Sequence, residues 1–185
     1  MSQLAMLLPA RPVAPLDPDA DVPESAVASG ARPATASDNE AIAHLLASVF
    51  PDQTWTPERV AAELTETPDV LRVFVLDDGD RIVATASARH NVDRFPGCGY
   101  VHWVGVSPDA QGRGLGRLIV SEVVDFFASE GLSPIVLETD DERLPALSSY
   151  LGLGFTPHYI NEGHQERWSK VLLALNAARH GKGDR

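Results

Sequence analysis

The spacing of apolar residues from position 31 onward predicts helices that each bury one face. Apolar side chains recur every three or four positions in two segments: Ile42, Leu45, Leu46 and Val49, and later Leu115, Leu118, Ile119, Val123, Phe126 and Phe127. Ser37 and Glu40 have the spacing of a capping box before the first helix, and Pro51 ends it. Gly131 closes the second helix. Two shorter helices are expected after Thr56 and at residues 145–153.

Short β-rich segments alternate with these helices. We expect strands at residues 70–76, 81–89, 100–106, 134–139 and 155–160. The turn at residues 77–80 joins the first two as a hairpin, and a helix joins the next two, which are therefore parallel. A C-terminal helix is predicted by the spacing of Trp168, Val171, Leu172 and Leu175. The fold class is therefore α/β, with a mixed sheet of about six strands flanked by helices.

Residues 1–30 have a different composition. The segment contains Pro9, Pro12, Pro15, Pro18 and Pro23, and no aromatic residue precedes Phe50. Such a segment has little to bury and few backbone donors, so we expect an extended arm. The arm is either solvated or docked on a partner subunit in a homodimer. Residues 31–178 then form one domain, followed by a polar tail at residues 179–185.

Charge and composition narrow the functional class. Fifteen Lys and Arg against 26 Asp and Glu give a net charge of −11, which argues against binding to nucleic acid or to an anionic membrane. No apolar run is long enough to span a bilayer, and the apolar start of the chain lacks the preceding basic residue of a secretory signal. One cysteine, Cys98, and the absence of an H-E-x-x-H motif give no sign of a metal site. We therefore expect a cytoplasmic protein.

The most informative segment is a glycine-rich turn between a strand and a helix, at residues 104–117. Gly112, Gly114 and Gly116 remove side chains where backbone amides can approach a ligand, and the helix N-terminus favours an anion. Residues 107–119 carry a local charge of +1, from two arginines and one aspartate. A P-loop would need Lys-Ser/Thr after the last glycine, and a dinucleotide site would need G-x-G-x-x-G directly after the strand. Neither pattern is present, so both alternatives are weak.

Two motifs resemble a known family. Gln111-x-x-Gly114-x-Gly116, after a strand that ends in Val106, is similar to the acyl-CoA pyrophosphate loop of the GNAT superfamily of N-acetyltransferases. Tyr150-x-x-x-Gly154-Phe155 is similar to that family's second signature. The resemblance covers roughly residues 31–160. It departs from the family at Arg143, where asparagine is frequent, and at the C-terminus, where the predicted helix replaces the last strand of a hairpin.

The resemblance implies direct transfer of an acetyl group from acetyl-CoA to an amine, with no metal. The residues that it implies for acetyl-CoA binding are Val104, Val106, Gln111, Gly112, Arg113, Gly114, Leu115, Gly116 and Arg117. Backbone N–H near Val104 would stabilise the thioester oxygen, and Gly105 is where we expect the strand irregularity that frees it. Tyr150 would protonate the CoA sulfur; the alternative is a tyrosine that only packs its ring beneath the co-substrate.

The base that deprotonates the amine has several candidates. Glu138 and Asp140 share a strand face, where they could raise each other's pKa or hold a cationic substrate. His102 titrates in the useful range and could act through water; a water relay without a side-chain base is the third alternative. Trp103 is expected to point away from His102 into the core. Trp55, like Asp140, is a candidate residue for the acceptor side.

The acceptor is a small-molecule amine or a peptide amine, and the sequence does not choose between them. Two other functions compete with catalysis. A non-catalytic acyl-CoA-binding or regulatory module on the same fold would keep the turn from Gln111 to Gly116 but would need neither Tyr150 nor Glu138. A nucleotide-binding protein of the dinucleotide type would bind NAD rather than CoA.

Overall fold

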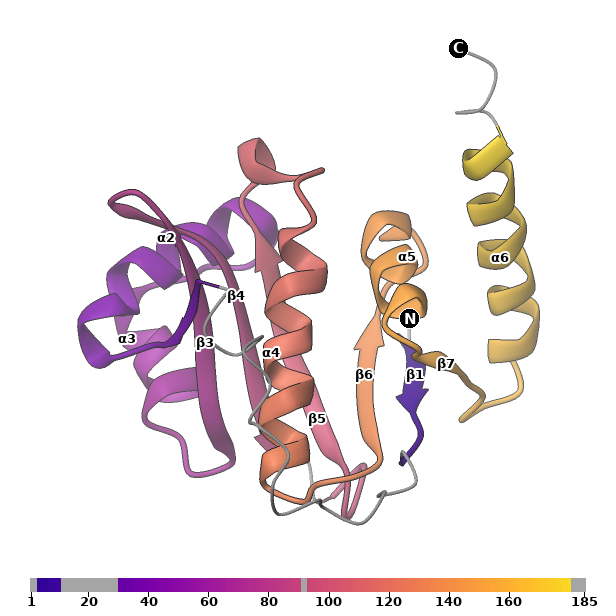
Figure 1. The fold of residues 1–185 in the computed structure, drawn as a ribbon, viewed down its shortest axis with the longest axis horizontal. Helices are drawn as coiled ribbons and strands as arrows, with labels where there is room; N and C mark the ends of the chain where they lie inside the picture. The colour runs from indigo at the N-terminus through magenta and orange to yellow at the C-terminus, as the bar shows by residue number, and fades with distance from the viewer. Residues whose placement is uncertain (1–2, 11–29, 91–92, 181–185) are drawn as a thin grey trace, which may run out of the picture.

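The computed structural model describes residues 3–10, 30–90 and 93–180. Seven strands form one mixed sheet in the order β2-β3-β4-β5-β6-β1-β7 (Figure 1). The strands are β1 (Leu4–Leu8), β2 (Ala31–Pro33), β3 (Val70–Asp78), β4 (Arg81–His90), β5 (Gly99–Val106), β6 (Ile135–Thr139) and β7 (Thr156–His158). The α-helices of the described residues are α2 (Asn39–Val49), α3 (Pro57–Val60), α4 (Leu115–Ser129), α5 (Leu144–Gly152) and α6 (His164–His180).

Helices cover both faces of the sheet because the strands alternate between two cores. On β3, Val73 and Val75 join the cluster formed with α2 and α3, whereas Phe74 and Leu76 join the cluster formed with α4. The predicted mixed α/β sheet and the C-terminal helix are confirmed. The start of α2 differs from the prediction: Thr35 and Asp38 form the capping box around a short 3-10 turn, and α2 begins at Asn39.

The described residues form seven strands rather than six, and one of the added strands corrects the predicted arm. β1 pairs antiparallel with β6 on one side and with β7 on the other (Figure 1). Its five residues are a continuous apolar run, and Leu4, Ala5 and Met6 are fully buried. The prediction of an extended arm is therefore wrong for Leu4–Leu8, because five consecutive apolar residues can fill a central strand without any aromatic residue. Residues 11–29 of the predicted arm lie outside the described residues.

The strand β1 changes two further expectations, which concern the bounds of the domain and the homodimer. The domain includes β1, so it does not begin at residue 31, and helix α6 extends through His180 into the predicted polar tail. In the sheet, β1 lies between β6 and β7. Since Leu4–Leu8 pair within their own chain, the docking arm no longer supplies a reason for a homodimer, which stays a prediction.

The two central parallel strands separate along their length. β5 and β6 pair only from Gly99↔Ile135 to Val101↔Leu137, and in Figure 1 they meet at the bottom and diverge towards the top. β5 is also irregular on its other side, because Thr85 pairs with Gly105 but Ser87 pairs with His102. Two residues therefore oppose one, and Trp103 has a φ of 47°. The irregularity lies at Trp103 and Val104, not at Gly105 as expected.

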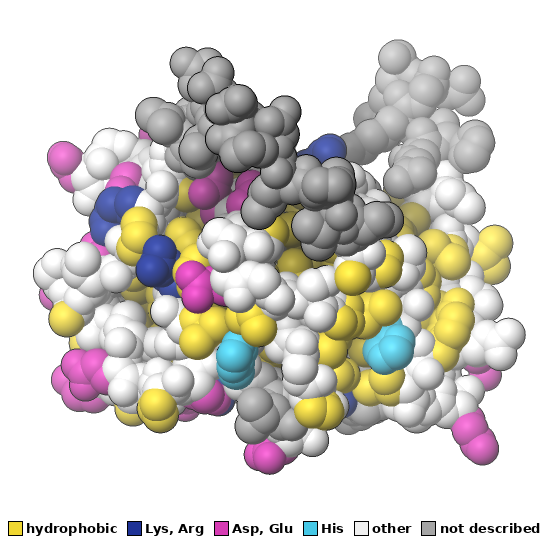
Figure 2. All heavy atoms as spheres, turned by 60° about the horizontal axis from the view of Figure 1, so that its bottom comes forward, with side chains coloured by type: hydrophobic (Ala, Val, Ile, Leu, Met, Phe, Trp, Pro, Cys, Tyr) yellow, Lys and Arg dark blue, Asp and Glu magenta, His cyan; other side chains and the backbone are white. Residues whose placement is uncertain are grey.

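The surface agrees with an acidic protein. Figure 2 shows the face at the bottom of Figure 1, on which acidic side chains are scattered and basic ones are few. The most exposed large apolar side chains include Tyr159, at 56%, and Leu173, at 70%, beside β7 and on α6. Among the helices that the structure describes, none is long and apolar enough to cross a membrane.

Candidate active site

Two cavities occupy the opening between β5 and β6. One, the loop cavity, has a volume of about 580 Å³ and is lined by the glycine-rich turn, the end of β5 and one side of α5. The other, the strand cavity, has a volume of about 550 Å³ and is lined by side chains of β5 and β6 and the loops beside them. Val104, Arg143 and Tyr150 line both cavities. The two cavities therefore meet at these three residues.

The loop cavity is built mainly from backbone. Gly112 and Gly114 have φ of 78° and 79°, a region that side chains disfavour, and α4 begins immediately after Gly114. The first turn of α4 contains no acidic residue. The N–H groups of Arg117 and Leu118 donate to the Gly114 carbonyl, which leaves those of Leu115 and Gly116 for a ligand. Leu115 and Gly116 complete this rim, and Gln111 donates from Nε2 to the Val106 carbonyl at 3.4 Å. A cradle of free N–H groups without side chains fits the pyrophosphate of an acyl-CoA.

The two arginines of the turn do not line either cavity. Arg113 forms an exposed ion pair with Asp78 of the β3–β4 hairpin, at 2.6 Å. The guanidinium of Arg117 lies beside Gly152 at the end of α5, 3.7 Å from the position of an added Cβ there. Of the residues predicted to bind acetyl-CoA, the structure therefore brings Val104, Val106, Gln111, Gly112, Gly114, Leu115 and Gly116 to one cavity and leaves Arg113 and Arg117 outside its lining.

Tyr150 stands where the two cavities meet. Its side chain is 6% exposed, and its ring packs edge-on against Phe155, with 6.2 Å between ring centroids. Burial raises the pKa of the Tyr150 hydroxyl to about 12, and the positive charge of Arg143 opposes that rise. The hydroxyl has no hydrogen-bond partner among the described residues. The geometry suits both a proton donor to the cavities and a packed ring, so the role of Tyr150 stays a prediction.

Glu138 lies on the floor of the strand cavity and is held by two partners. Its side chain is 5% exposed, and one carboxylate oxygen accepts a hydrogen bond from Arg94 at 2.6 Å. The other oxygen accepts a hydrogen bond from the Tyr100 hydroxyl at 3.1 Å. Burial and the charge of Glu138 raise the pKa of Tyr100 well above its usual value, so Tyr100 remains a donor. Glu138 thus lines the cavity with both carboxylate oxygens hydrogen-bonded.

His102 is poorly suited to accept a proton. Burial, and then the charge of Arg89, lower the pKa of His102 to about 4, so the ring is neutral at pH 7. Arg89 lies 3.3 Å from Nδ1, and because a guanidinium only donates, the ring proton is on Nε2. The ring stacks on Tyr100 at 5.2 Å and lies 4.9 Å from Trp103. The structure thus favours Glu138 over His102 as the base.

The bulge changes the position of Trp103, and this corrects the expected geometry of β5. Trp103 lines the strand cavity beside His102 instead of pointing away from it, because the extra residue of the bulge breaks the alternation of side chains. Trp55, 7% exposed, packs behind Trp103 at 4.7 Å and lies under the Arg59 guanidinium. Trp55 lines neither cavity and lies behind Trp103, so its role on the acceptor side stays a prediction.

The charges of the strand cavity are balanced. Asp140 lines the cavity, accepts a hydrogen bond from Gln3 at 3.3 Å and lies 3.5 Å from Arg143. Glu138 is paired with Arg94. Each of the two carboxylates has an arginine beside it, and the expectation that they hold a cationic substrate stays a prediction.

Several residues of the strand cavity were not predicted to have a functional role. They are Gln3, Phe50, Gln53, Arg94, Tyr100 and Arg143. No local motif marks them, since they come from the residue before β1, from β5, from the ends of helices and from loops, which only the tertiary structure brings together. Arg143 alone gave a signal, as a departure from the resembled motif. Among the described residues, no group of three or more His, Cys, Asp or Glu side chains could hold a metal ion.

Comparison with known proteins gives a family match and curated relatives. The model of the acetyltransferase (GNAT) family matches residues 38–155. A mycothiol acetyltransferase from Tsukamurella paurometabola is 30% identical over 158 residues, which cover 80% of this chain and 54% of that protein. The chain spans about half or less of the length of the curated relatives it matches.

Solved structures share the fold. The ribosomal-protein-S18-alanine N-acetyltransferase from Escherichia coli superposes with a TM-score of 0.59 at 22% identity, covering 72% of this chain and 81% of that one. AAC(6′)-Iy, in complex with the bisubstrate analogue CoA-S-monomethyl-acetylneamine, superposes with a TM-score of 0.61 at 17% identity, covering 71% of this chain and 94% of that one. At these identities the superpositions establish the fold alone.

Proposed function

Because this chain belongs to the acetyltransferase (GNAT) family, we propose that it transfers the acetyl group of acetyl-CoA to the amine of a small polar acceptor. The transfer is a direct attack in a ternary complex. The observation that carries this proposal is the meeting of two cavities at Val104, Arg143 and Tyr150, since a thioester entering from one side meets an amine entering from the other. The free cysteine and the use of acetyl-CoA favour a cytoplasmic location.

The loop cavity takes acetyl-CoA. The glycine-rich turn and the N-terminus of α4 hold the pyrophosphate, and the pantetheine arm runs along β5 from Val106 to Val104, where β6 has already separated from β5. This direction brings the thioester to the junction of the cavities. The bulge at Trp103 and Val104 disturbs the ladder to β4 and frees backbone N–H near Val104 for the thioester oxygen.

The chemical step then follows from the groups at the junction. The amine nitrogen attacks the thioester carbonyl carbon, and the new C–N bond forms while negative charge collects on the oxygen beside the Val104 N–H. The C–S bond breaks with its electron pair on sulfur, and Tyr150 donates a proton to that sulfur. The proton lost by the amine passes through water to the carboxylate of Glu138, which lines the strand cavity between Arg94 and Tyr100. Transfer of this proton back through water restores Tyr150.

The strand cavity takes the acceptor. Its volume of about 550 Å³ suits a small molecule, and its amide, carboxylate and guanidinium groups suit an acceptor rich in hydrogen-bonding groups. The balanced charges favour an acceptor without strong net charge. Relatives at about 30% identity are named mycothiol acetyltransferases, so the unacetylated form of mycothiol is the first acceptor to test.

A panel of amines tests the proposal. The protein is incubated with acetyl-CoA and with unacetylated mycothiol, amino sugars, amino acids or short peptides, and product is detected by mass spectrometry. We expect acetylation of small polar amines and little acetylation of peptides. If acetyl-CoA binds but no amine is acetylated, the chain is a non-catalytic acyl-CoA-binding module. If a thermal-shift assay shows stabilisation by NAD and not by CoA, the family-based assignment of the loop cavity is wrong.

A further inference from the structure

We propose that Arg143 is a further catalytic residue, whose guanidinium holds the CoA sulfur as it becomes a thiolate. This inference rests on the proposed function and assigns a role to the one residue of the cavity junction that has none. Val104 and Tyr150, the other two junction residues, already serve the oxygen and the sulfur. Arg143 stands where the resembled family frequently has asparagine.

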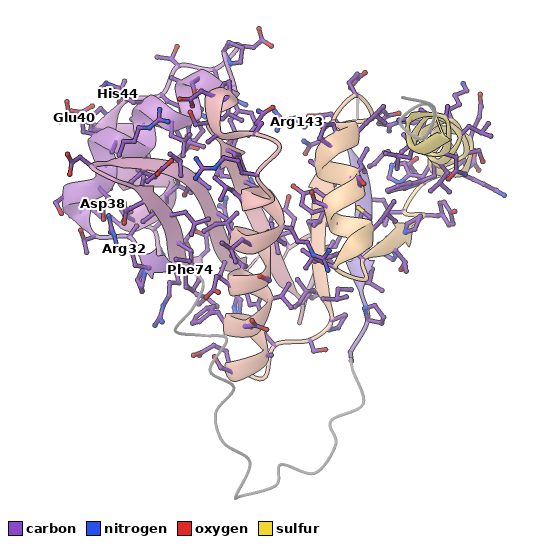
Figure 3. All side chains as sticks on the ribbon, turned by 45° about the horizontal axis from the view of Figure 1, so that its top comes forward. Arg32, Asp38, Glu40, His44, Phe74 and Arg143 are labelled. Carbon is purple, nitrogen blue, oxygen red and sulfur yellow. The ribbon has the colours of Figure 1, made fainter. Side chains whose placement is uncertain are left out.

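The position of Arg143 follows from the fold. Arg143 is the N-cap of α5, in the short connection after β6, and Tyr150 lies two turns further along the same helix. Both residues line both cavities in the opening between β5 and β6. Figure 3 shows Arg143 at the open end of that gap, and Arg143 lines both cavities.

Contacts with Phe50 and Asp140 hold the Arg143 guanidinium in place and leave its terminal N–H groups able to bind a ligand. It lies over the Phe50 ring at 4.4 Å from the centroid, which fixes its plane. Its Nε atom is 3.5 Å from an Asp140 carboxylate oxygen, longer than a normal hydrogen bond, and the Arg143 side chain is 34% exposed. Its terminal N–H groups form no hydrogen bond with the other described residues. They are therefore available to an anion at the junction.

The surroundings reinforce the charge of Arg143. The N-terminus of α5 carries partial positive charge, and the first turn of α5 has no acidic residue to cancel it. A thiol beside an arginine and a helix N-terminus has a lowered pKa. Of the other charged groups around the junction, Asp140 opposes this effect, and Glu138 is neutralised by Arg94. His102 is neutral at pH 7.

Arg143 also acts on the proton donor. Burial raises the pKa of Tyr150 to about 12, and Arg143 is the charge that counteracts the rise. During transfer, the electron pair of the C–S bond moves to sulfur, the guanidinium stabilises that charge, and the Tyr150 proton then converts the thiolate to the thiol. Arg143 thus favours the leaving of the sulfur and, by opposing the raised pKa of Tyr150, makes that hydroxyl a better proton donor.

The direct test is a titration of CoA bound to the protein, followed by the ultraviolet absorbance of the thiolate. Bound to the wild-type protein, the CoA thiol should titrate at least about one pKa unit below the thiol of free CoA titrated in the same buffer. Arg143→Gln should abolish this lowering, and Arg143→Lys should keep part of it. Asp140→Asn should lower the bound thiol pKa further, because it removes the opposing carboxylate. An analogue of CoA that lacks the sulfur gives the background.

Turnover provides the second readout. Arg143→Gln should reduce kcat at least about tenfold with little change in the KM for acetyl-CoA. Arg72→Gln is the matched control, because Arg72 also lies over a phenylalanine ring, that of Phe126, but lines neither cavity. Arg72→Gln should change neither the thiol pKa nor kcat.

Two results overturn the assignment. One is a bound thiol that titrates at the same pH in wild type and Arg143→Gln. The other is an Arg143→Gln variant that raises only the KM for the acceptor, which would make Arg143 an acceptor-binding residue. The titration needs neither an acceptor nor turnover. A lowered thiol pKa in a wild-type protein that acetylates no amine would therefore refute the proposed function while the thiolate site stands.

Discussion

The loop cavity and the strand cavity adjoin each other, yet they are built in different ways. The loop cavity depends on backbone, with Gly112 and Gly114 in left-handed conformations before the N-terminus of α4. The strand cavity depends on side chains from distant segments, such as Arg94, Glu138 and Tyr100, which hold one another by hydrogen bonds. A backbone site suits a constant ligand such as acetyl-CoA, and a side-chain site suits an acceptor that differs from enzyme to enzyme.

The largest effect is expected from Gly114→Val, which breaks the backbone site. Gly114 has a φ of 79°, which a β-branched residue cannot adopt without strain, so the turn must change shape. Acetyl-CoA at 100 times its Kd should stabilise the wild-type protein by about 2.7 kcal/mol, and the variant should show no such shift. Thermal unfolding with and without acetyl-CoA measures this.

Gly131→Val is the matched control for that experiment. Gly131, with a φ of 68°, ends α4 and also has open space around an added Cβ, but it lines neither cavity. It should lose comparable stability and keep the full response to acetyl-CoA. An unchanged response to acetyl-CoA in Gly114→Val would contradict the assignment of the loop cavity as the acetyl-CoA site.

Tyr150→Phe tests the junction between the two cavities. The substitution removes the hydroxyl and keeps the ring that packs on Phe155, so acetyl-CoA should bind almost as before. Loss of a general acid should lower kcat by at least about tenfold. Steady-state kinetics with a calorimetric Kd separates the two quantities, and Tyr159→Phe, at an exposed tyrosine, is the control. Strongly weakened acetyl-CoA binding with a normal kcat would mean that Tyr150 only packs.

Glu138→Gln and His102→Gln compare the two candidate bases of the strand cavity. Glu138→Gln should lower the rate by about tenfold or more and remove the acidic limb of the pH–rate profile, since a group that must be deprotonated is lost. His102→Gln should leave that limb in place, because the histidine is neutral and its Nδ1 already faces Arg89. If the acidic limb disappears only in His102→Gln, then His102 is the base and Glu138 is not.

The smallest effect concerns stability rather than rate. The pKa of His102 falls from 6.5 to about 4 on folding. Between these pH values the unfolded chain binds more protons at His102 than the folded protein does. The free energy of unfolding therefore decreases as the pH falls from 6.5 towards 4. Above pH 6.5 no such cost applies. Urea unfolding across this range should show a shallower acid loss in His102→Gln than in wild type, and equal slopes would contradict the buried, neutral ring.

The two cavities also differ in how far the sequence predicts them. The glycines of the turn and the Tyr150 motif are local signals, because a left-handed turn and a helix start need particular residues at fixed spacing. Seven of the nine residues predicted for acetyl-CoA binding line the loop cavity. The pairing of Glu138 with Arg94 and Tyr100 joins residues 44 and 38 positions apart, and no local pattern reports it.

For the fold, too, the sequence predicted the features with local signals and missed those that depend on distant residues. Helix and strand periodicity predicted the mixed sheet and the C-terminal helix α6, since these patterns are local. The strand β1 was missed because prolines follow it closely and because its partners β6 and β7 lie more than a hundred residues away. The bulge at Trp103 was also misplaced, because a glycine is the usual sequence signal for such an irregularity and Gly105 lies two residues away.

The account rests on the claim that the two cavities hold both substrates at once, and initial rates measured over a grid of acetyl-CoA and acceptor concentrations test it most directly. For each fixed acceptor concentration, the reciprocal rate is plotted against the reciprocal acetyl-CoA concentration. Direct attack in a ternary complex predicts lines that intersect, and no CoA release in the absence of acceptor beyond slow hydrolysis. Parallel lines, with a stoichiometric burst of CoA and an acetylated protein before acceptor is added, would contradict it.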